Sequence, residues 1–117
     1  MPVVEITRDA NVISDEVVTL LLGFLPGLVA QALHTPQTPI TVQDVDVRVR
    51  TPGRFEVTAF DLQIIISASY SRERNENLAD RHRQLMDAIR TQGVLPAGIK
   101  AYLWMTLPPA KFGEFPV

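Results

Sequence analysis

Hydrophobic and polar positions change their period along the first half of the chain, and these periods predict a strand, a long helix and a second strand. Residues 1–6 are rich in β-branched side chains and are typical of a strand. An apolar run from residue 14 to about residue 33 predicts a helix, which Ser14 can cap and Pro26 would kink. Residues 42–49 then alternate between charged residues and valine, as a half-covered strand does.

The second half of the chain repeats this order. Residues 55–69 predict a strand, and its centre at 64–66 is apolar on both faces, as in a strand covered from both sides. Residues 75–92 carry an apolar stripe at helical spacing, and Gly93 suits the end of that helix. Residues 99–107 predict the last strand.

A turn separates the two halves. The sequence Thr51-Pro52-Gly53-Arg54 suits a type II turn, with proline at the second position and glycine at the third. The chain is therefore predicted to be one domain, 1–117, with a repeat of pattern between 1–50 and 55–117. Each half can form a parallel crossover. The predicted fold class is α+β, with duplicated β-α-β units, a four-stranded mixed sheet and two helices on one face.

Composition and charge exclude several classes of protein. With 46% hydrophobic and 21% charged residues, the 117-residue chain is not an intrinsically disordered one. The net charge of −2 gives no electrostatic reason to expect nucleic acid or an anionic membrane as a partner. The chain has no cysteine, so disulfides, thiolate nucleophiles and cysteine metal sites are excluded.

The apolar run in the first helix could be mistaken for a targeting or membrane segment. It carries no charged residue between residues 17 and 34, but acidic rather than basic residues precede it. Glycine, proline and polar residues interrupt it, whereas a membrane span needs about 20 apolar residues. We therefore expect a buried helix in a cytoplasmic protein. Its apolar residues surround it almost completely, so subunit contacts are also expected.

Most familiar catalytic motifs are missing. His34 and His82 are the only histidines, and neither has a partner at metal-ligand spacing. There is no Gly-x-Ser-x-Gly elbow, and Gly23 and Gly27 lie within a helical pattern rather than in a phosphate-binding loop. The remaining candidates are the start of the chain and the arginines.

Pro2 is the candidate base. If an aminopeptidase removes Met1, Pro2 carries a terminal secondary amine. A terminal amine has a pKa of about 7.7–8.0, and an apolar wall or a neighbouring cation lowers that pKa. The amine would then be a general base near neutral pH. A retained Met1 would make the same nitrogen an amide and abolish its basicity.

Four arginines are candidate anion ligands, because guanidinium groups bind carboxylates bidentately. Arg48 and Arg50 share one face of the predicted strand at 42–49, and Arg72 and Arg74 precede the second helix. The alternative is that nearby acidic residues neutralise these arginines: Asp44 and Asp46 on the same strand face, and Glu73 and Glu76 beside the helix.

Taken together, these features resemble the tautomerase superfamily, and more closely the 5-carboxymethyl-2-hydroxymuconate isomerases. The resemblance covers nearly the whole chain. It rests on Met1-Pro2, on Leu25-Pro26-Gly27-Leu28, on Val45-Asp46-Val47-Arg48-Val49-Arg50, on the passage from Ile64-Ile65-Ile66 to Ser71-Arg72-Glu73-Arg74, and on Lys111-Phe112-Gly113.

The resemblance implies a cofactor-independent and metal-independent isomerase in the degradation of aromatic compounds. Pro2 would move a proton along an unsaturated 2-oxo or 2-hydroxy acid, and arginines would hold the substrate carboxylates. Arg48 is the nearest match to one family arginine, with Arg50 next. The resemblance also implies a homotrimer.

Two further positions follow from the same resemblance. In relatives a glycine precedes the second substrate-binding arginine; that glycine is missing here, so either Arg72 or Arg74 could match. Phe112 could take the place of the phenylalanine that lies beside the proline. Decarboxylation or hydration on the same scaffold, and a non-catalytic oligomeric binding domain, are the alternative functions.

Overall fold

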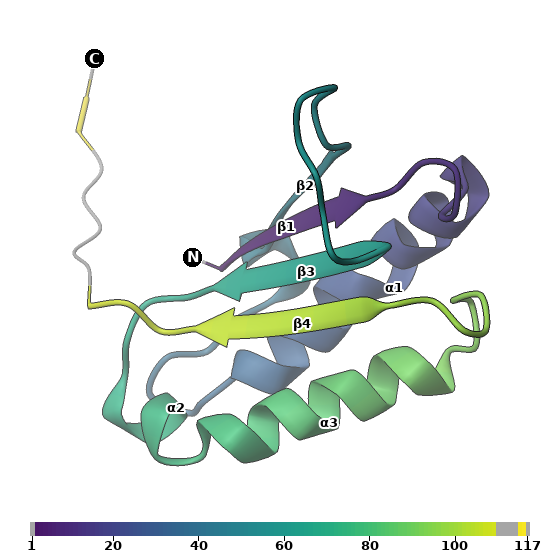
Figure 1. Ribbon diagram of the computed structural model, residues 1–117. Coiled ribbons are helices and arrows are strands. Elements are labelled where there is room, and N and C mark those ends of the chain that lie inside the picture. Colours follow the sequence, from purple (N-terminus) through teal and green to yellow (C-terminus); the bar gives the residue numbers. More distant parts are fainter. Residues whose placement is uncertain (1, 110–114, 117) are drawn as a thin grey trace.

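Four strands form one mixed sheet in the computed structural model, which describes residues 2–109 and 115–116 (Figure 1). The strands are β1 (Val3–Arg8), β2 (Asp46–Arg50), β3 (Leu62–Ser67) and β4 (Ala101–Thr106), in the order β2-β1-β3-β4. β1 is parallel to β2 and antiparallel to β3, and β3 is parallel to β4. The predicted fold class is confirmed.

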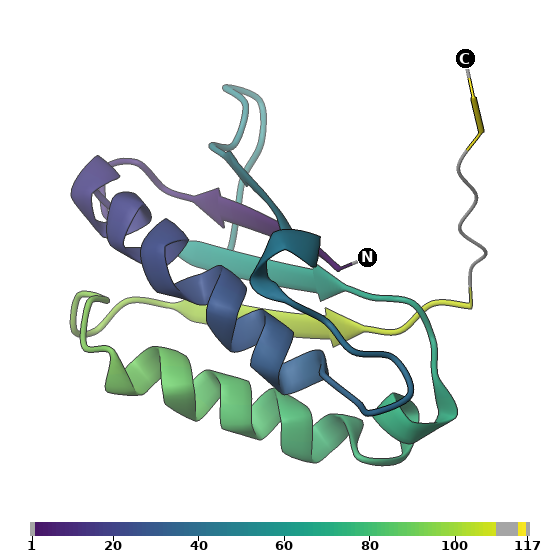
Figure 2. The same cartoon turned by 180° about the vertical axis from the view of Figure 1, so that it is seen from behind.

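Two long helices cover one face of this sheet (Figure 2). They are α1 (Asp15–Leu33), between β1 and β2, and α3 (Leu78–Thr91), between β3 and β4. A short helix, α2 (Arg72–Glu76), precedes α3, and a 3-10 turn, η1 (Val42–Asp44), precedes β2. Gly93 follows α3 with φ of +68°, a conformation that glycine adopts without strain, so the predicted helix end is confirmed.

The core lies between the sheet and the helices. Alternate residues of the two central strands point to the helices and are buried, in the order that the strand period requires. The fully buried aliphatic residues of this layer include Val4, Ile6, Leu21, Leu25, Val29, Leu33, Leu62 and Ile66. Burying such side chains stabilises the fold by about 1.5–3 kcal/mol each.

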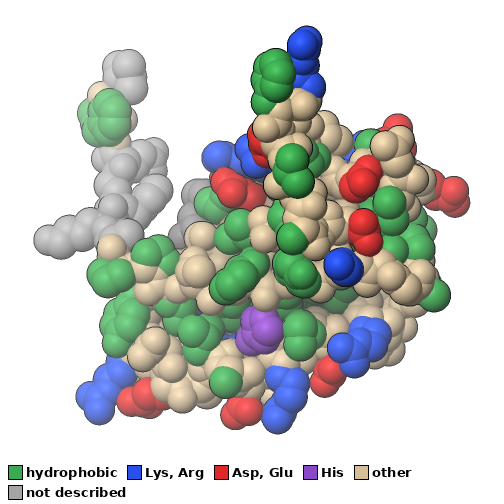
Figure 3. Space-filling model, viewed as in Figure 1, with side chains coloured by type: hydrophobic (Ala, Val, Ile, Leu, Met, Phe, Trp, Pro, Cys, Tyr) green, Lys and Arg blue, Asp and Glu red, His purple; other side chains and the backbone are tan. Residues whose placement is uncertain are grey.

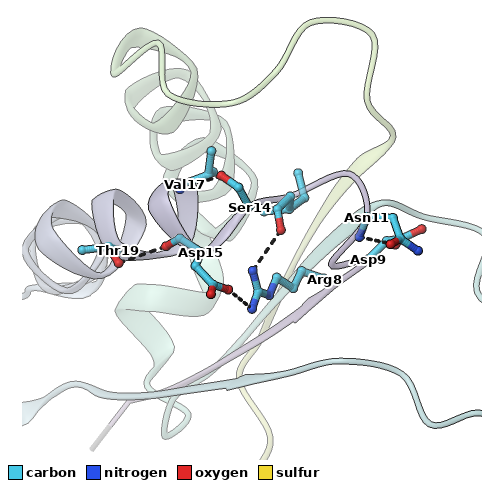
Figure 4. Close-up of polar contacts among 8 residues, drawn as sticks. Arg8, Asp9, Asn11, Ser14, Asp15, Val17 and Thr19 are labelled. Carbon is cyan, nitrogen blue, oxygen red and sulfur yellow. Dashed lines mark hydrogen bonds and ion pairs between the residues drawn. The ribbon is translucent and has the colours of Figure 1, made fainter.

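Polar contacts hold the start of α1 against the end of β1 (Figure 4). The Ser14 side chain accepts a hydrogen bond from the Val17 N–H at 3.3 Å, as predicted for the helix cap. Arg8 donates to the Ile13 carbonyl at 2.9 Å and forms an ion pair with Asp15. Ser14 and Arg8 together thereby fix the direction in which the chain enters α1.

By length and composition α1 could cross a membrane. In this fold one side of it is buried against the sheet and α3, as in the core helix of a folded domain. Leu20 and Leu22 on its other side remain 47% and 41% exposed. The helix thus carries more apolar surface than a single chain covers, as its sequence indicates.

The predicted strand at residues 42–49 is wrong at its start. Residues Val42–Asp44 form the 3-10 turn, and β2 begins only at Asp46. The reason is local: Asp44 accepts hydrogen bonds from the backbone and hydroxyl of Thr41, which makes a capping box. Asp44 therefore does not share the strand face with Arg48.

The prediction for the segment between β2 and β3 is also wrong. Residues 55–61 form a loop rather than the start of a strand, and the loop projects beyond the sheet (Figure 1). Gly53 is not among the described glycines with positive φ, so no type II turn forms at residues 51–54. The chain turns two residues later, at 53–56, where the Glu56 N–H donates to the Gly53 carbonyl at 2.9 Å. The single helix predicted over 75–92 is also wrong at its start, because the chain forms two helices, α2 and α3, that meet at Asn77.

No helix of the described residues covers the other face of the sheet, and we call this face the open face (Figure 3). Apolar side chains lie on it: Ile65 of β3 pairs with Trp104 of β4, which is 57% exposed, and Tyr102 is 43% exposed. The strand at 64–66 was predicted to be covered from both sides. Within one chain only its helix-facing side is fully buried.

The cap of α1 gives a direct test of this fold. We expect Ser14→Ala to lower the free energy of unfolding by about 1 kcal/mol, because the Val17 N–H loses its acceptor. Ser14→Asp should retain most of the stability, since its carboxylate can accept the same bond. Urea denaturation of both variants measures the difference, and equal midpoints for Ser14→Ala and the unmodified protein would contradict the cap.

Candidate active site

Pro2 directly precedes β1, and the pairing of β1 with β2 fixes its place. Its carbonyl accepts a hydrogen bond from the Asp46 N–H at 3.0 Å, at the start of the parallel ladder. Pro2 is less than 2% exposed. By the two-residue period of a strand it belongs to the same side as Val4 and Ile6, which face the helices.

A pocket of about 260 Å³ opens beside Pro2, where β1 begins and β3 ends. Its walls come from the loop after α1, from η1, from the end of β3 and from α2. The lining residues are Pro2, Thr38, Pro39, Ile40, Asp44, Ala68, Ser69 and Arg74. Two segments that lie far apart in the sequence thus bring Pro2 and one predicted arginine, Arg74, into one pocket.

Arg74 is 2% exposed and its guanidinium is held by backbone groups from three segments. Nε donates to the Leu33 carbonyl at 2.9 Å, Nη1 donates to the Ser69 carbonyl at 3.1 Å, and Nη2 donates to the Thr38 carbonyl at 3.1 Å. Nη1 also lies 3.4 Å from the Ser69 hydroxyl. These four bonds leave one of the five guanidinium N–H groups without an acceptor among the described residues.

No described carboxylate forms an ion pair with Arg74; its hydrogen-bond acceptors are neutral. Burial lowers the pKa of Arg74, nearby Arg81 lowers it further, and Glu73 raises it. An arginine side chain remains charged despite such shifts. A buried cation without an anionic partner favours the binding of an anion in the adjoining pocket.

The loop after α1 forms one wall of the pocket and is ordered by its own side chains. Thr35 is buried, and its hydroxyl accepts a hydrogen bond from the Thr38 N–H at 2.9 Å. Nδ1 of His34 accepts one from the Ile40 N–H at 3.3 Å. His82 lies elsewhere, with Nε2 2.8 Å from the Leu103 carbonyl. Each histidine thus contacts a backbone group.

The other predicted binding residues do not line this pocket within one chain. Arg48 and Arg50 pair in register with Glu5 and Thr7 and belong to the open face. Arg72 is exposed and forms an ion pair with Glu76 at 2.9 Å. Arg50 lies 3.5 Å from a carboxylate oxygen of Glu56.

Arg72 is therefore paired with a nearby acid, which is the alternative that the sequence offers for the arginines. The carboxylate near Arg50 belongs to Glu56, whereas the sequence pattern suggests Asp44 and Asp46 as its partners. Phe112 lies outside the described residues.

Two larger hollows lie along β4, away from Pro2. One, of about 320 Å³, lies beside the end of α3 and is lined mainly by apolar residues, with Arg90 and Tyr102. The other, of about 720 Å³, follows the edge of β4 past His82 and Trp104. Neither hollow brings Pro2 together with a buried cation. The smaller pocket beside Pro2 is therefore the better candidate for a catalytic site.

Comparison with known proteins gives matches only among solved structures. No sequence family and no curated protein matches the chain. A member of the cis-3-chloroacrylic acid dehalogenase family superposes with a TM-score of 0.60 at 13% identity, over 96% of this chain and 81% of that one. Pt0534, in a structure inactivated by 2-oxo-3-pentynoate, superposes with a TM-score of 0.56 at 19% identity, over 97% and 89%.

A weaker match is the macrophage migration inhibitory factor from Trichinella spiralis, with a TM-score of 0.48 at 14% identity, over 97% and 94%. The first two superpositions, which extend over nearly the whole chain, show which fold it adopts. The chain has a tautomerase-like fold. None of the three structures is named as a 5-carboxymethyl-2-hydroxymuconate isomerase, so that closer resemblance stays a prediction.

Within this tautomerase-like fold the sequence pattern missed one charged residue of the pocket. Asp44 was placed on a strand face, whereas its turn directs it to the pocket lining. The hydrogen bonds from the Thr41 backbone and hydroxyl lower the pKa of Asp44, so it is ionised at neutral pH. The spacing Thr41-x-x-Asp44 was the available signal, since a hydroxyl residue followed three positions later by an acid marks a capping box.

The role of Arg74 in holding this site together can be measured. We expect Arg74→Met to lower the free energy of unfolding by about 2–4 kcal/mol, because three backbone carbonyls lose their donor. Arg72→Met, two residues earlier on the exposed side of α2, should cost less than about 0.5 kcal/mol. Urea denaturation compares the two variants, and equal losses would show that the buried guanidinium is not a structural centre.

Proposed function

We propose that the protein is a cofactor-independent isomerase that uses the N-terminal amine of Pro2 as a general base on a small unsaturated 2-oxo or 2-hydroxy acid. The observation that carries this proposal is the shared pocket, in which Pro2 lies beside a buried guanidinium that has no described anionic partner. Pro2 supplies the base and Arg74 supplies the charge that a substrate carboxylate needs.

The proposed reaction is the transfer of one proton. The Pro2 nitrogen takes a proton from a hydroxyl or from carbon next to the carbonyl, and electrons move into the conjugated chain. The N–H group of Arg74 that has no described acceptor binds the substrate carboxylate, and the positive charge of the guanidinium stabilises the enolate that develops in conjugation with that carboxylate. The protonated amine then returns the proton further along the chain, so neither a metal nor a cofactor is required.

Two further findings support this chemistry. Arg74 lines the same pocket as Pro2, and a neighbouring cation lowers the pKa of an amine towards neutrality. One solved structure of the same fold is of a protein inactivated by 2-oxo-3-pentynoate, which is itself an unsaturated 2-oxo acid. The proposal requires removal of Met1, because only then is the Pro2 nitrogen an amine.

Substitution of Pro2 tests the base. Protein whose intact mass confirms loss of Met1 is screened by absorbance with phenylpyruvate, 2-hydroxymuconate and 5-carboxymethyl-2-hydroxymuconate. We expect Pro2→Ala to lower kcat/KM by about 10²–10⁴-fold, the usual contribution of a general base, with little change in the urea midpoint. Arg83→Ala, on the exposed side of α3, is the matched control and should leave kcat/KM unchanged.

An unchanged rate in Pro2→Ala would exclude the proposed base. Retention of Met1 in all natively expressed protein would leave a non-catalytic binding domain of the same fold. Turnover by decarboxylation or hydration would support Pro2 and Arg74 as the active site but would contradict the proposed isomerisation.

We also propose that the protein assembles as a homotrimer, with the open face and the edge of β4 in contact with other copies. Trp104 and Tyr102 on that face are about half exposed, and Phe55 and Val57 on the projecting loop are 88% and 100% exposed. Apolar surface gathered in this way is typical of a protein interface.

Light scattering tests the assembly. We expect a particle of three times the 13.0 kDa chain mass, and we expect Trp104→Asp to shift it towards the monomer because a charge would be buried in the interface. Glu16→Lys, at the exposed start of α1, is the control and should leave the mass unchanged. A monomer at micromolar concentration would contradict the proposed assembly.

A further inference from the structure

The charges of the pocket beside Pro2 suggest which acids it can accept. Among the described lining residues Arg74 is the one cation and Asp44 is the one carboxylate. The guanidinium lies on the buried side, whereas Asp44 is exposed. A ligand whose carboxylate reaches Arg74 therefore extends towards a fixed negative charge.

Asp44 is held in this position by its own turn. One carboxylate oxygen, Oδ2, accepts hydrogen bonds from the Thr41 N–H at 2.8 Å and from the Thr41 hydroxyl at 3.1 Å. The other oxygen, Oδ1, has no hydrogen-bond partner among the described residues. The side chain is thus anchored through one oxygen within the lining of the pocket, and its second oxygen has no described partner.

We propose that Asp44 is a specificity-determining residue that restricts the site to monoanionic carboxylates by repelling a second carboxylate on the ligand. This inference rests on the proposed function, because it concerns the ligand of the same pocket. It narrows the substrate class to acids with one carboxylate at the Arg74 end and an uncharged group at the other end.

The positions of the other arginines agree with this restriction. A dicarboxylate would need a second cation, and within one chain none of Arg48, Arg50 and Arg72 lines the pocket. Asp44 is exposed, so water screens its charge, but it still repels a second carboxylate in the same pocket. Removing the charge of Asp44 should therefore benefit a dianion and leave a monoanion almost unaffected.

The test uses two probes with the same carbon skeleton, crotonate with one carboxylate and fumarate with two. Binding to the full chain is measured by NMR titration, which needs no turnover. We expect crotonate to bind at least about threefold more tightly than fumarate, and Asp44→Asn to reduce that ratio by about three- to tenfold. The amide oxygen of asparagine can still accept the Thr41 bonds, so the turn should remain folded.

Glu16→Gln is the matched control. It removes one negative charge from the exposed start of α1, outside the lining of the pocket, and should leave the ratio unchanged. Fumarate binding as tightly as crotonate would overturn the inference, as would equal effects of the two variants or the absence of binding by both probes. If crotonate binds more tightly than fumarate as expected but no Pro2-dependent turnover is found, the proposed isomerase is wrong and the role of Asp44 in selecting monoanions stands.

Discussion

The carbonyl groups at the end of α1 impose the constraint on which the remaining structure depends. This helix has no basic residue in its last turn and is followed by an extended His34 rather than by glycine, so its terminal acceptors need donors from elsewhere. Arg74 donates to Leu33, and Arg81 donates to Ala32 and His34 at 2.8 and 3.2 Å. The second half of the chain therefore completes the helix of the first half.

The same solution creates the pocket. Arg74 reaches the helix end through a buried position between β3 and the loop after α1, and it carries its charge there. The cost of burying that charge is offset by backbone carbonyls at the negative end of a helix dipole, and further by any anion that enters. The structural role of Arg74 and its proposed ligand-binding role thus reside in one side chain, which has no described acidic partner.

Much of the fold could be predicted from the sequence because its elements are encoded locally. The alternation of charged residues and valine at 46–50, the cap at Ser14 and the glycine after α3 each act over a few residues. The loop at 55–61 was mistaken for a strand because Phe55 and Val57 are strand-forming residues, and only the absence of a pairing partner leaves them exposed. For the site, Pro2 could be proposed from its chemistry, but the choice of Arg74 over Arg72 depends on contacts with residues 33 and 38, which no local pattern encodes.

The hydrogen bond from the Asp46 N–H to the Pro2 carbonyl has a practical consequence for handling the protein. Because the ladder engages the carbonyl side of this residue, a purification tag fused ahead of it would leave the sheet intact while acylating the nitrogen. If Pro2 is the base proposed above, such a preparation would keep its fold but lack the catalytic amine. Tags placed at the other terminus, or cut away without leaving a scar, avoid this false negative.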